Sequence, residues 1–347
     1  MIRTTRMPAR IAAGLGCAAA VLTAAPAASQ TALRASVDVL VELEDQLVVA
    51  ADGEAAELND LYVKAEALLA LRLAGRGGLF ATVKLEPVID PERDRAFEDL
   101  GLFAEELYLG LELGPAGVDI GKLRTPFGIV NEVEPGLFGD EIASGYEMTE
   151  RLGLRGSLPV EADGATHILS AALLTADTSE LKRSLFTERD TSPEAFGHRS
   201  DRTGRELYVV QMSGALERSA YALGVRYRAP GEPGEADETG AVFAFSRAFD
   251  WGRLTGEAAY FPRYEEDRAS STFLTLVGEV PFDAAEIVAA YGLRHADGTS
   301  TDHFLAVSLG YEPIEGVALQ AGYRLVAEAG DTSHTIGLNL GYEFDFD

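Results

Sequence analysis

Cysteine, tryptophan and positive charge are all scarce in this chain of 347 residues. It has one cysteine and one tryptophan, so no disulfide can form within it, and a small disulfide-stapled domain is excluded. Lysine and arginine together number 29 against 56 acidic residues, which gives a formal net charge of −27. A basic surface cannot offset such acidity, so we expect no nucleic-acid partner.

Long apolar runs and catalytic motifs are lacking as well. Beyond the N-terminus no stretch reaches the ~18 uninterrupted apolar residues of a membrane-spanning helix, which excludes a helical membrane protein. The five histidines form no metal-binding doublet, and no G-x-S-x-G element is present. The sequence therefore predicts no enzyme, no catalytic residue, no metal site and no cofactor.

The first 29 residues have the pattern of a targeting segment. Three arginines precede an apolar stretch from Ile11 to Ala24, and small residues follow up to Ser29. A positively charged N-terminal region, a short apolar region and a cleavage site of small residues are typical of a secretory signal peptide. We therefore predict a signal peptide over 1–29 and a mature chain over 30–347, which has a charge of −30 after the loss of three arginines and contains no cysteine.

The mature chain alternates with a period of two. Tyr221, Leu223 and Val225, for example, share one face, while the residues between them are small or charged. Because successive side chains of a strand point to opposite faces, each such segment has an apolar face and a polar face. Two segments, 165–174 and 205–213, are apolar in either phase. We count sixteen segments in all, near 35–44, 61–73, 79–86, 105–113, 117–123, 151–158, 165–174, 205–213, 218–228, 240–248, 252–261, 271–280, 284–294, 302–311, 316–327 and 335–346.

The connections between these segments alternate in length. Long connections, such as 124–150 and 175–204, alternate with short ones, such as 74–78 and 214–217. Both termini fall on the rim that has the short connections. Short turns on one rim and long loops on the other are typical of an outer-membrane barrel. The polar faces are rich in glycine and alanine among charges, which suits a lumen wall. We therefore predict an all-β fold, a transmembrane antiparallel up-and-down β-barrel of about sixteen strands, wide enough to enclose an aqueous channel.

One part of the chain resembles a known family. The stretch Glu105-Glu106-Leu107-Tyr108-Leu109-Gly110-Leu111, followed by Gly121-Lys122 and Pro126-Phe127-Gly128, resembles Gram-negative porins, most nearly the substrate-selective porins of the phosphate-porin and siderophore-porin kind. The resemblance implies a place in the bacterial outer membrane, among lipid and lipopolysaccharide, and the passage of small hydrophilic solutes or ions. Porins of this size are often trimers, so it also implies a homotrimer as the assembly to test.

The same resemblance gives loop 124–150 a role, because in sixteen-stranded porins the loop after the fifth strand commonly folds into the channel and narrows it. This loop carries Glu132, Glu134, Asp140 and Glu141. We predict that they face inward arginines across the lumen, namely Arg72, Arg151, Arg155, Arg226 and Arg324. Opposed charges of this kind would select ions, and the excess of acid predicts a preference for cations. The simpler alternative is a solvated acidic surface loop with scattered lumen charges.

Three other functions remain open from the sequence. One is a substrate-specific uptake receptor for a siderophore or another anionic ligand, because loop 175–204 has a mixed aromatic and cationic set: Lys182, Arg183, Phe186, Arg189, Phe196, His198, Arg199 and Arg202. Another is a hydrolase at the barrel rim, built on Ser300, Asp302 and His303. The third is a soluble exported β-solenoid or sandwich, which would dissolve without detergent.

Overall fold

The computed structural model describes most of the chain. The described residues are 33–52, 57–73, 76–133, 135–141, 143–146, 148–162, 164–189, 206–230, 236–264, 269–298 and 301–346. The predicted signal peptide over 1–29 lies outside these ranges, as do Glu134 of loop 124–150 and the residues 190–205 of loop 175–204.

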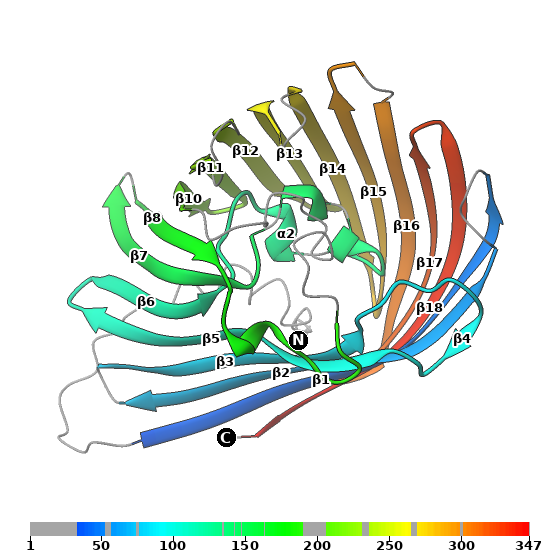
Figure 1. Cartoon of the computed structure of the whole chain (residues 1–347), viewed down its shortest axis with the longest axis horizontal. Coiled ribbons are helices and arrows are strands. Elements are labelled where there is room, and N and C mark those ends of the chain that lie inside the picture. The colour runs from blue at the N-terminus through cyan, green and yellow to red at the C-terminus, as the bar shows by residue number, and fades with distance from the viewer. Residues whose placement is uncertain are drawn as a thin grey trace.

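Sixteen strands form the wall of a closed barrel. The sheet has eighteen strands, but β4 and β9 are two residues long and join it from loops. Neighbouring wall strands pair antiparallel, and β1 pairs with β18, which closes the ring (Figure 1). The wall strands are β1 Leu33–Ala51, β2 Asn59–Leu73, β3 Gly77–Pro87, β5 Leu100–Leu113, β6 Ala116–Leu123, β7 Arg151–Ala162, β8 Ala165–Ala176, β10 Leu207–Leu216, β11 Ser219–Arg228, β12 Glu238–Phe249, β13 Gly252–Arg263, β14 Ser271–Phe282, β15 Ala285–Ala296, β16 Thr301–Ile314, β17 Val317–Glu328 and β18 Asp331–Phe346. Each of the sixteen predicted segments falls on one of these strands, so the predicted fold class is confirmed.

The loops contain several short elements. These are β4 Arg95–Ala96, β9 Leu185–Phe186, the helix α2 Val130–Val133, and the 3₁₀ turns η1 Gly139–Glu141, η2 Ser144–Tyr146 and η3 Glu180–Lys182. The sequence analysis predicted none of them, because elements this short show no periodicity. Within the described ranges, no helix is both long enough and apolar enough to cross a membrane.

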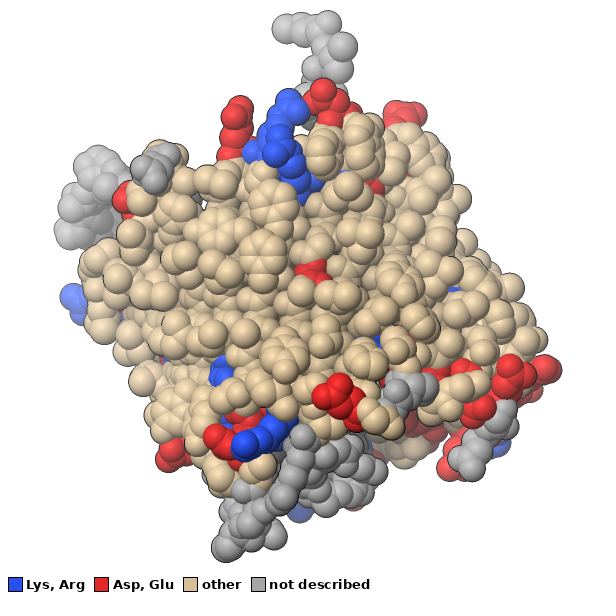
Figure 2. Space-filling model, turned by 90° about the horizontal axis from the view of Figure 1, so that it is seen from above, with Lys and Arg blue, Asp and Glu red and all other residues tan. Residues whose placement is uncertain are grey.

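The outer face of the barrel is apolar. Phe243, Leu276 and Leu338 are 53%, 54% and 54% exposed, and similar side chains stand outward around the wall. Figure 2 shows one side of the barrel, where the middle is nearly free of charge and acidic and basic side chains gather toward the two rims. A closed sheet with an apolar outer belt is the form in which strands can cross a bilayer, because every wall strand has hydrogen-bonded neighbours. The predicted outward direction of the apolar face is confirmed.

The interior contains a second apolar region, which explains the two ambiguous segments. Leu174 on β8, and Leu207 and Val209 on β10, are buried at 1%, 3% and 2% exposure and belong to a cluster inside the barrel. Tyr208 and Val210, their neighbours on β10, point outward and are 43% and 44% exposed. These strands are apolar on both faces because the inner face packs against a loop and the outer face meets lipid.

A β-bulge interrupts the alternation in β5. The register between β3 and β5 shifts at Thr82/Val83, which leaves Glu105 as the extra residue. Both acids at this point face inward: Glu105 accepts a hydrogen bond from Lys84 Nζ at 2.8 Å, and Glu106 accepts one from Thr82 Oγ1 at 3.2 Å. The bulge therefore adds a second carboxylate to the lumen at this point of the strand.

A buried ion pair holds the loop between β3 and β5 at the rim. Arg95 donates to both carboxylate oxygens of Asp60, at 2.7 and 2.8 Å, and to the backbone oxygen of Ile89 at 2.6 Å. The hydrogen bonds to Asp60 raise the pKa of the Arg95 guanidinium, so Arg95 remains charged over the whole physiological pH range. The loop is thereby pinned beside β2 through β4.

Candidate functional site

Residues 124–150, here called the inward loop, leave the wall after β6 and return to it at β7. Their described part lies inside the barrel, where α2 marks it in Figure 1. Its two ends are joined, because Thr125 N donates to Met148 O at 2.9 Å. Its first residue is tied to the wall: Arg124 N donates to Glu106 at 2.9 Å, and Arg155 Nη1 donates to Arg124 O at 2.6 Å.

One buried carboxylate on β13 anchors the inward loop near both of its ends. Glu257 Oε2 accepts hydrogen bonds from the backbone N–H groups of Ile129 and Val130, at 2.5 and 3.1 Å. Its other oxygen, Oε1, accepts the hydroxyl of Tyr146 at 2.5 Å. These bonds satisfy donors at both ends of the loop with a single side chain that is 4% exposed. The loop is thus held against the side of the barrel that contains β13.

Close packing against glycines reinforces this attachment. Leu137 N donates to Ser308 Oγ at 3.2 Å on β16. Leu137 and Phe138 lie over Gly322 on β17 and Gly337 on β18, where a side chain would collide with them. A Cβ built on Gly337 would lie 2.7 Å from Leu137 Cδ2 and 2.9 Å from Phe138 Cζ. Glycine at this position lets the loop approach the wall.

This contact gives a direct test of the loop position. We expect Gly337→Ala to push Leu137 and Phe138 away from β18, and overpacking of this kind costs about 1–3 kcal/mol. The temperature at which the folded barrel unfolds on a gel should therefore fall.

The matched control for that variant is Gly341→Ala. Gly341 lies on the same strand and on the same inner face, but a Cβ there would meet no atom closer than 3.7 Å. If both variants unfold at the same temperature as the unchanged protein, Leu137 and Phe138 do not pack against β18 as described.

An unfilled space, here called the passage, lies on the other side of the inward loop. A cavity of about 280 Å³ lies between the loop and the wall made by β1, β2, β3 and β5, with side chains from β17 and β18 at its margin. Six carboxylates and two ammonium groups line it: Glu42, Glu44, Glu66, Glu86, Glu105, Glu150, Lys64 and Lys84. The inward loop contributes Gly136, Leu137, Thr149 and Glu150 to the lining.

Neighbouring carboxylates neutralise both lysines of the passage. Lys84 Nζ lies 2.8 Å from Glu105 and 3.7 Å from Glu66. Lys64 Nζ lies 3.3 Å from Glu44, which also accepts the hydroxyl of a tyrosine on β2 at 2.6 Å. With two cations among six acids, the lining keeps a net negative charge at neutral pH.

Besides Arg155, which holds the first residue of the inward loop, two of the predicted arginines contact this loop directly. Arg324 forms an ion pair with Glu141 of the loop and lies 5.0 Å from the ring of Phe138. Arg226 donates to Tyr146 O at 3.0 Å and to Glu238 on β12 at 2.8 Å. The structure therefore places both guanidinium groups at points where the loop meets the wall.

The other predicted residues occupy different places. Arg155 pairs with Asp119 at 2.9 Å and holds the root of the loop, and Arg151 is buried at the first position of β7. Arg72 lies near the short-turn end of β2, with its guanidinium 5.2 Å from the ring centre of Phe80. Glu132 is half-buried in α2, while Glu134 and the side chain of Asp140 lie outside the described part. The opposed-charge arrangement stays a prediction.

Most acids of the passage were missed in the sequence analysis, although part of the signal was there. Glu42 and Glu44 alternate with outward apolar residues of β1, so their phase indicates the lumen. Glu86 has the same phase on β3 as Lys84. Glu105 gives no such signal, because only the bulge turns it inward beside Glu106.

The described residues give little support to the hydrolytic site or to the ligand-binding loop 175–204. His303 Nδ1 lies 2.8 Å from the hydroxyl of Tyr291, and the carboxylate of Asp302 accepts the backbone N–H of Ala329 at 3.1 Å. The two proposed partners of a hydrolytic site are thus bonded elsewhere, and Ser300 lies outside the described residues. Of the cationic loop, Arg189 is buried in an ion pair, and Phe196, His198, Arg199 and Arg202 are not among the described residues.

Comparison with solved structures identifies the fold. The chain is similar to OmpF of Salmonella typhi in complex with daunomycin, with a TM-score of 0.63 and 11% identity over 90% of this chain and 98% of that one. It is similar to the outer-membrane channel DcaP of Acinetobacter baumannii (TM-score 0.60, 10% identity, 92% and 100% covered). It is also similar to the anion-selective porin of Comamonas acidovorans (TM-score 0.58, 12% identity, 91% and 100% covered).

These neighbours define the class of fold: the chain is a sixteen-stranded barrel of the porin type, as the resemblance in residues 105–128 implied. By sequence, no family model and no curated protein matches it. At 10–12% identity the likeness concerns the fold, and the residues of the lumen must decide what the barrel does.

Proposed function

We propose that this protein is an outer-membrane channel for the passive diffusion of small hydrophilic solutes and ions, with a preference for cations. The observation that supports it is the passage between the inward loop and β1–β5, lined by six carboxylates and two lysines. A sixteen-stranded barrel is too wide for side chains to fill, so a water-filled path is expected.

The cation preference follows from where the charge lies. Carboxylates around a narrow, low-dielectric passage attract cations and repel anions more strongly than the same charges on an open surface. The whole chain is also acidic, with a net charge of −27, so the mouths of the channel concentrate cations as well. Because bulk salt screens charges beyond about 8 Å at physiological ionic strength, the lining of the passage should matter most.

The fold alone cannot supply this preference, since one of the similar structures is described as an anion-selective porin. The same barrel architecture hosts either selectivity, and the difference must come from lumen side chains. Lumen arginines would favour anions. In this chain two of them form ion pairs with carboxylates, Arg226 with Glu238 and Arg324 with Glu141.

The test is the reversal potential of the purified protein in a planar bilayer with a potassium chloride gradient. We expect the current to rise in steps and to vary linearly with voltage. The reversal potential should have the sign of a cation-selective channel, and its magnitude should increase as the salt concentration is lowered. A reversal potential of zero or of the anion sign contradicts the preference. Absence of current from protein that is folded, as judged by a mobility difference between unheated and boiled gel samples, contradicts the channel itself.

The loop acids and the assembly are further parts of this proposal. Replacement of Glu132, Glu134, Asp140 and Glu141 by their amides should change conductance and selectivity, if these groups act on ions in the lumen. The expected assembly is a homotrimer embedded among outer-membrane lipid and lipopolysaccharide. The mass of the unheated protein in detergent, measured by light scattering, tests the trimer independently of the current.

A further inference from the structure

The barrel wall has a gap along one edge of β5. β3 pairs with β5 over residues 100–111, whereas β6 pairs with it only over 107–113. The difference arises because β6 ends at Leu123, where the chain turns into the lumen. The backbone of residues 100–106 therefore lacks a β6 partner, and open strand edges are costly in a wall that faces lipid.

The described residues that follow β8, 177–189, cover the first part of this gap, at residues 100–102 of β5. Within this segment β9 pairs antiparallel with residues 101–102 of β5. Thr187 N extends the pairing by donating to Leu100 O at 3.1 Å. Since β3 occupies the other edge of β5, β9 must lie on the edge that β6 leaves open. Segment 177–189 is thus a piece of the wall supplied from a loop.

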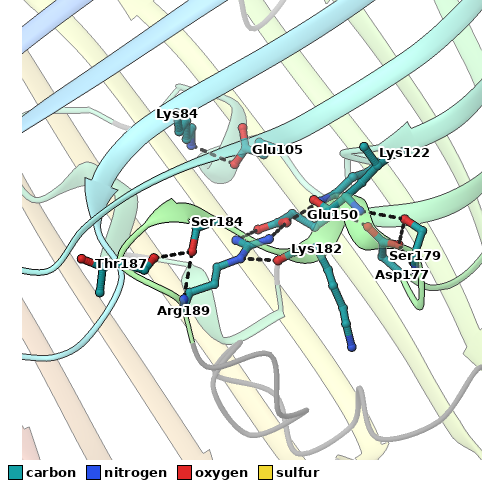
Figure 3. A network of polar contacts seen from close by, with 11 residues as sticks. Lys84, Glu105, Lys122, Glu150, Asp177, Ser179, Lys182, Ser184, Thr187 and Arg189 are labelled. Carbon is teal, nitrogen blue, oxygen red and sulfur yellow. Dashed lines mark hydrogen bonds and ion pairs between the residues drawn. The ribbon is translucent and has the colours of Figure 1, made fainter.

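Four buried charged side chains join this segment to the end of the inward loop (Figure 3). Glu150, just before β7, accepts hydrogen bonds from Arg189 at 2.8 and 2.5 Å and from Lys122 Nζ at 2.6 Å. Lys122 also lies 3.3 Å from Asp177. The side chains of Lys122, Asp177, Arg189 and Glu150 are 0%, 4%, 6% and 14% exposed, and we call them the junction cluster.

Both cations of the junction cluster also hold the backbone of the segment. Lys122 Nζ donates to Leu181 O at 3.0 Å, and Arg189 Nε donates to Lys182 O at 2.5 Å. The guanidinium of Arg189 lies 4.1 Å from the ring centre of Phe103, which faces inward from β5. Removal of either cation would therefore release segment 177–189 and also take hydrogen bonds away from Glu150.

The backbone conformation of Glu150 indicates that its carboxylate is needed at this position. Its φ angle is +54°, in the left-handed region that costs energy for a residue with a side chain and that glycine would occupy freely. A glutamate at such a position needs a compensating interaction. Its carboxylate gains three charge-assisted hydrogen bonds there.

We propose that segment 177–189 seals the barrel wall where the chain turns inward, and that Glu150 is the positioning residue that locks this seal to the inward loop through Lys122 and Arg189. The seal and the channel are coupled because Glu150 also lines the passage. The seal itself does not depend on the proposed cation preference, and the experiment below keeps the two apart.

The test is limited proteolysis of Arg189→Gln by trypsin in detergent, with mass spectrometry of cleavage after Lys182. Loss of a bidentate partner leaves a buried carboxylate short of hydrogen bonds, so the released form of the segment should become more populated. Because cleavage follows the population of the open form, we expect the bond after Lys182 to be cut about tenfold faster or more. Glu150→Gln should act in the same direction, and Arg189→Lys should lie between, since lysine keeps the charge but not the bidentate geometry.

The matched control is Arg93→Gln, which breaks an exposed ion pair of 2.7 Å between Arg93 and Glu98 in another loop. Cleavage after Lys182 should stay at the rate of the unchanged protein in this control. Equal rates in Arg189→Gln, Arg189→Lys and Arg93→Gln overturn the proposal. Should Arg189→Gln not fold, the comparison of Arg189→Lys with the control decides the matter. Bilayer recordings provide the separate arm: faster cleavage without current in any variant sinks the channel function but leaves the seal intact.

Discussion

Glu257→Ala should convert a quiet channel into one that closes repeatedly. The substitution leaves two backbone N–H groups and the Tyr146 hydroxyl without their acceptor inside the barrel. Each unsatisfied group costs about 1–3 kcal/mol. We expect a loop released from β13 to move into the passage, so single-channel recordings should show brief closures and a lower mean current.

Two comparisons separate anchoring from the loss of a charge. Glu257→Gln keeps an acceptor oxygen for the backbone donors, so its closures should be much rarer. Glu279→Ala removes another buried acid from the neighbouring strand β14, where no hydrogen bond to the inward loop is present among the described contacts, and its current should stay quiet. An equally quiet open level in Glu257→Ala would show that the loop does not depend on this anchor.

Neutralising the acids of the passage should remove most of the cation preference. In the triple variant Glu42→Gln, Glu66→Gln, Glu86→Gln, the lining loses three of its six carboxylates while both lysines remain. Glu44 and Glu105, which pair with Lys64 and Lys84, are left in place. We expect the cation-to-anion permeability ratio, measured from the reversal potential, to fall severalfold, because these carboxylates line a confined space where bulk salt screens them little.

Glu279→Gln is again the control, since this acid faces inward but does not line the passage. Its permeability ratio should stay near that of the unchanged protein. If the triple variant keeps its full cation preference, the selectivity arises elsewhere, for instance in acidic loops at the mouths. If Glu279→Gln loses as much cation preference as the triple variant loses per carboxylate removed, total lumen charge matters and the passage has no special role.

The wall of the barrel was predictable because its physics is periodic. Lipid outside and water inside impose an alternation on every strand, and Tyr221 to Tyr227 show it plainly. The alternation became ambiguous only at 165–174 and 205–213, where Leu174, Leu207 and Val209 pack against the inward loop. There the second apolar face was itself a signal that something fills part of the lumen.

The passage was predictable only in part, because its geometry depends on contacts between distant residues. Nothing local in the sequence links Glu257 to Ile129, which lie 128 positions apart. The bulge at Glu105 and the left-handed backbone at Glu150 also break the local pattern. The loop acids were predicted as site residues because they are clustered in the sequence. The acids of β1 and β3 are instead separated by the outward-facing residues of each strand.

Cysteine modification at Glu66 tests most directly whether ions pass between the inward loop and β1–β5. The only natural cysteine is Cys17, in the predicted signal peptide, so Glu66→Cys introduces the one reactive thiol of the mature chain. Addition of a bulky, water-soluble thiol reagent should reduce its single-channel current stepwise, and reduction of the adduct should restore it. Leu79→Cys, which faces outward at 47% exposure, should not respond. A current in Glu66→Cys that is unchanged after verified modification would contradict the location of the passage.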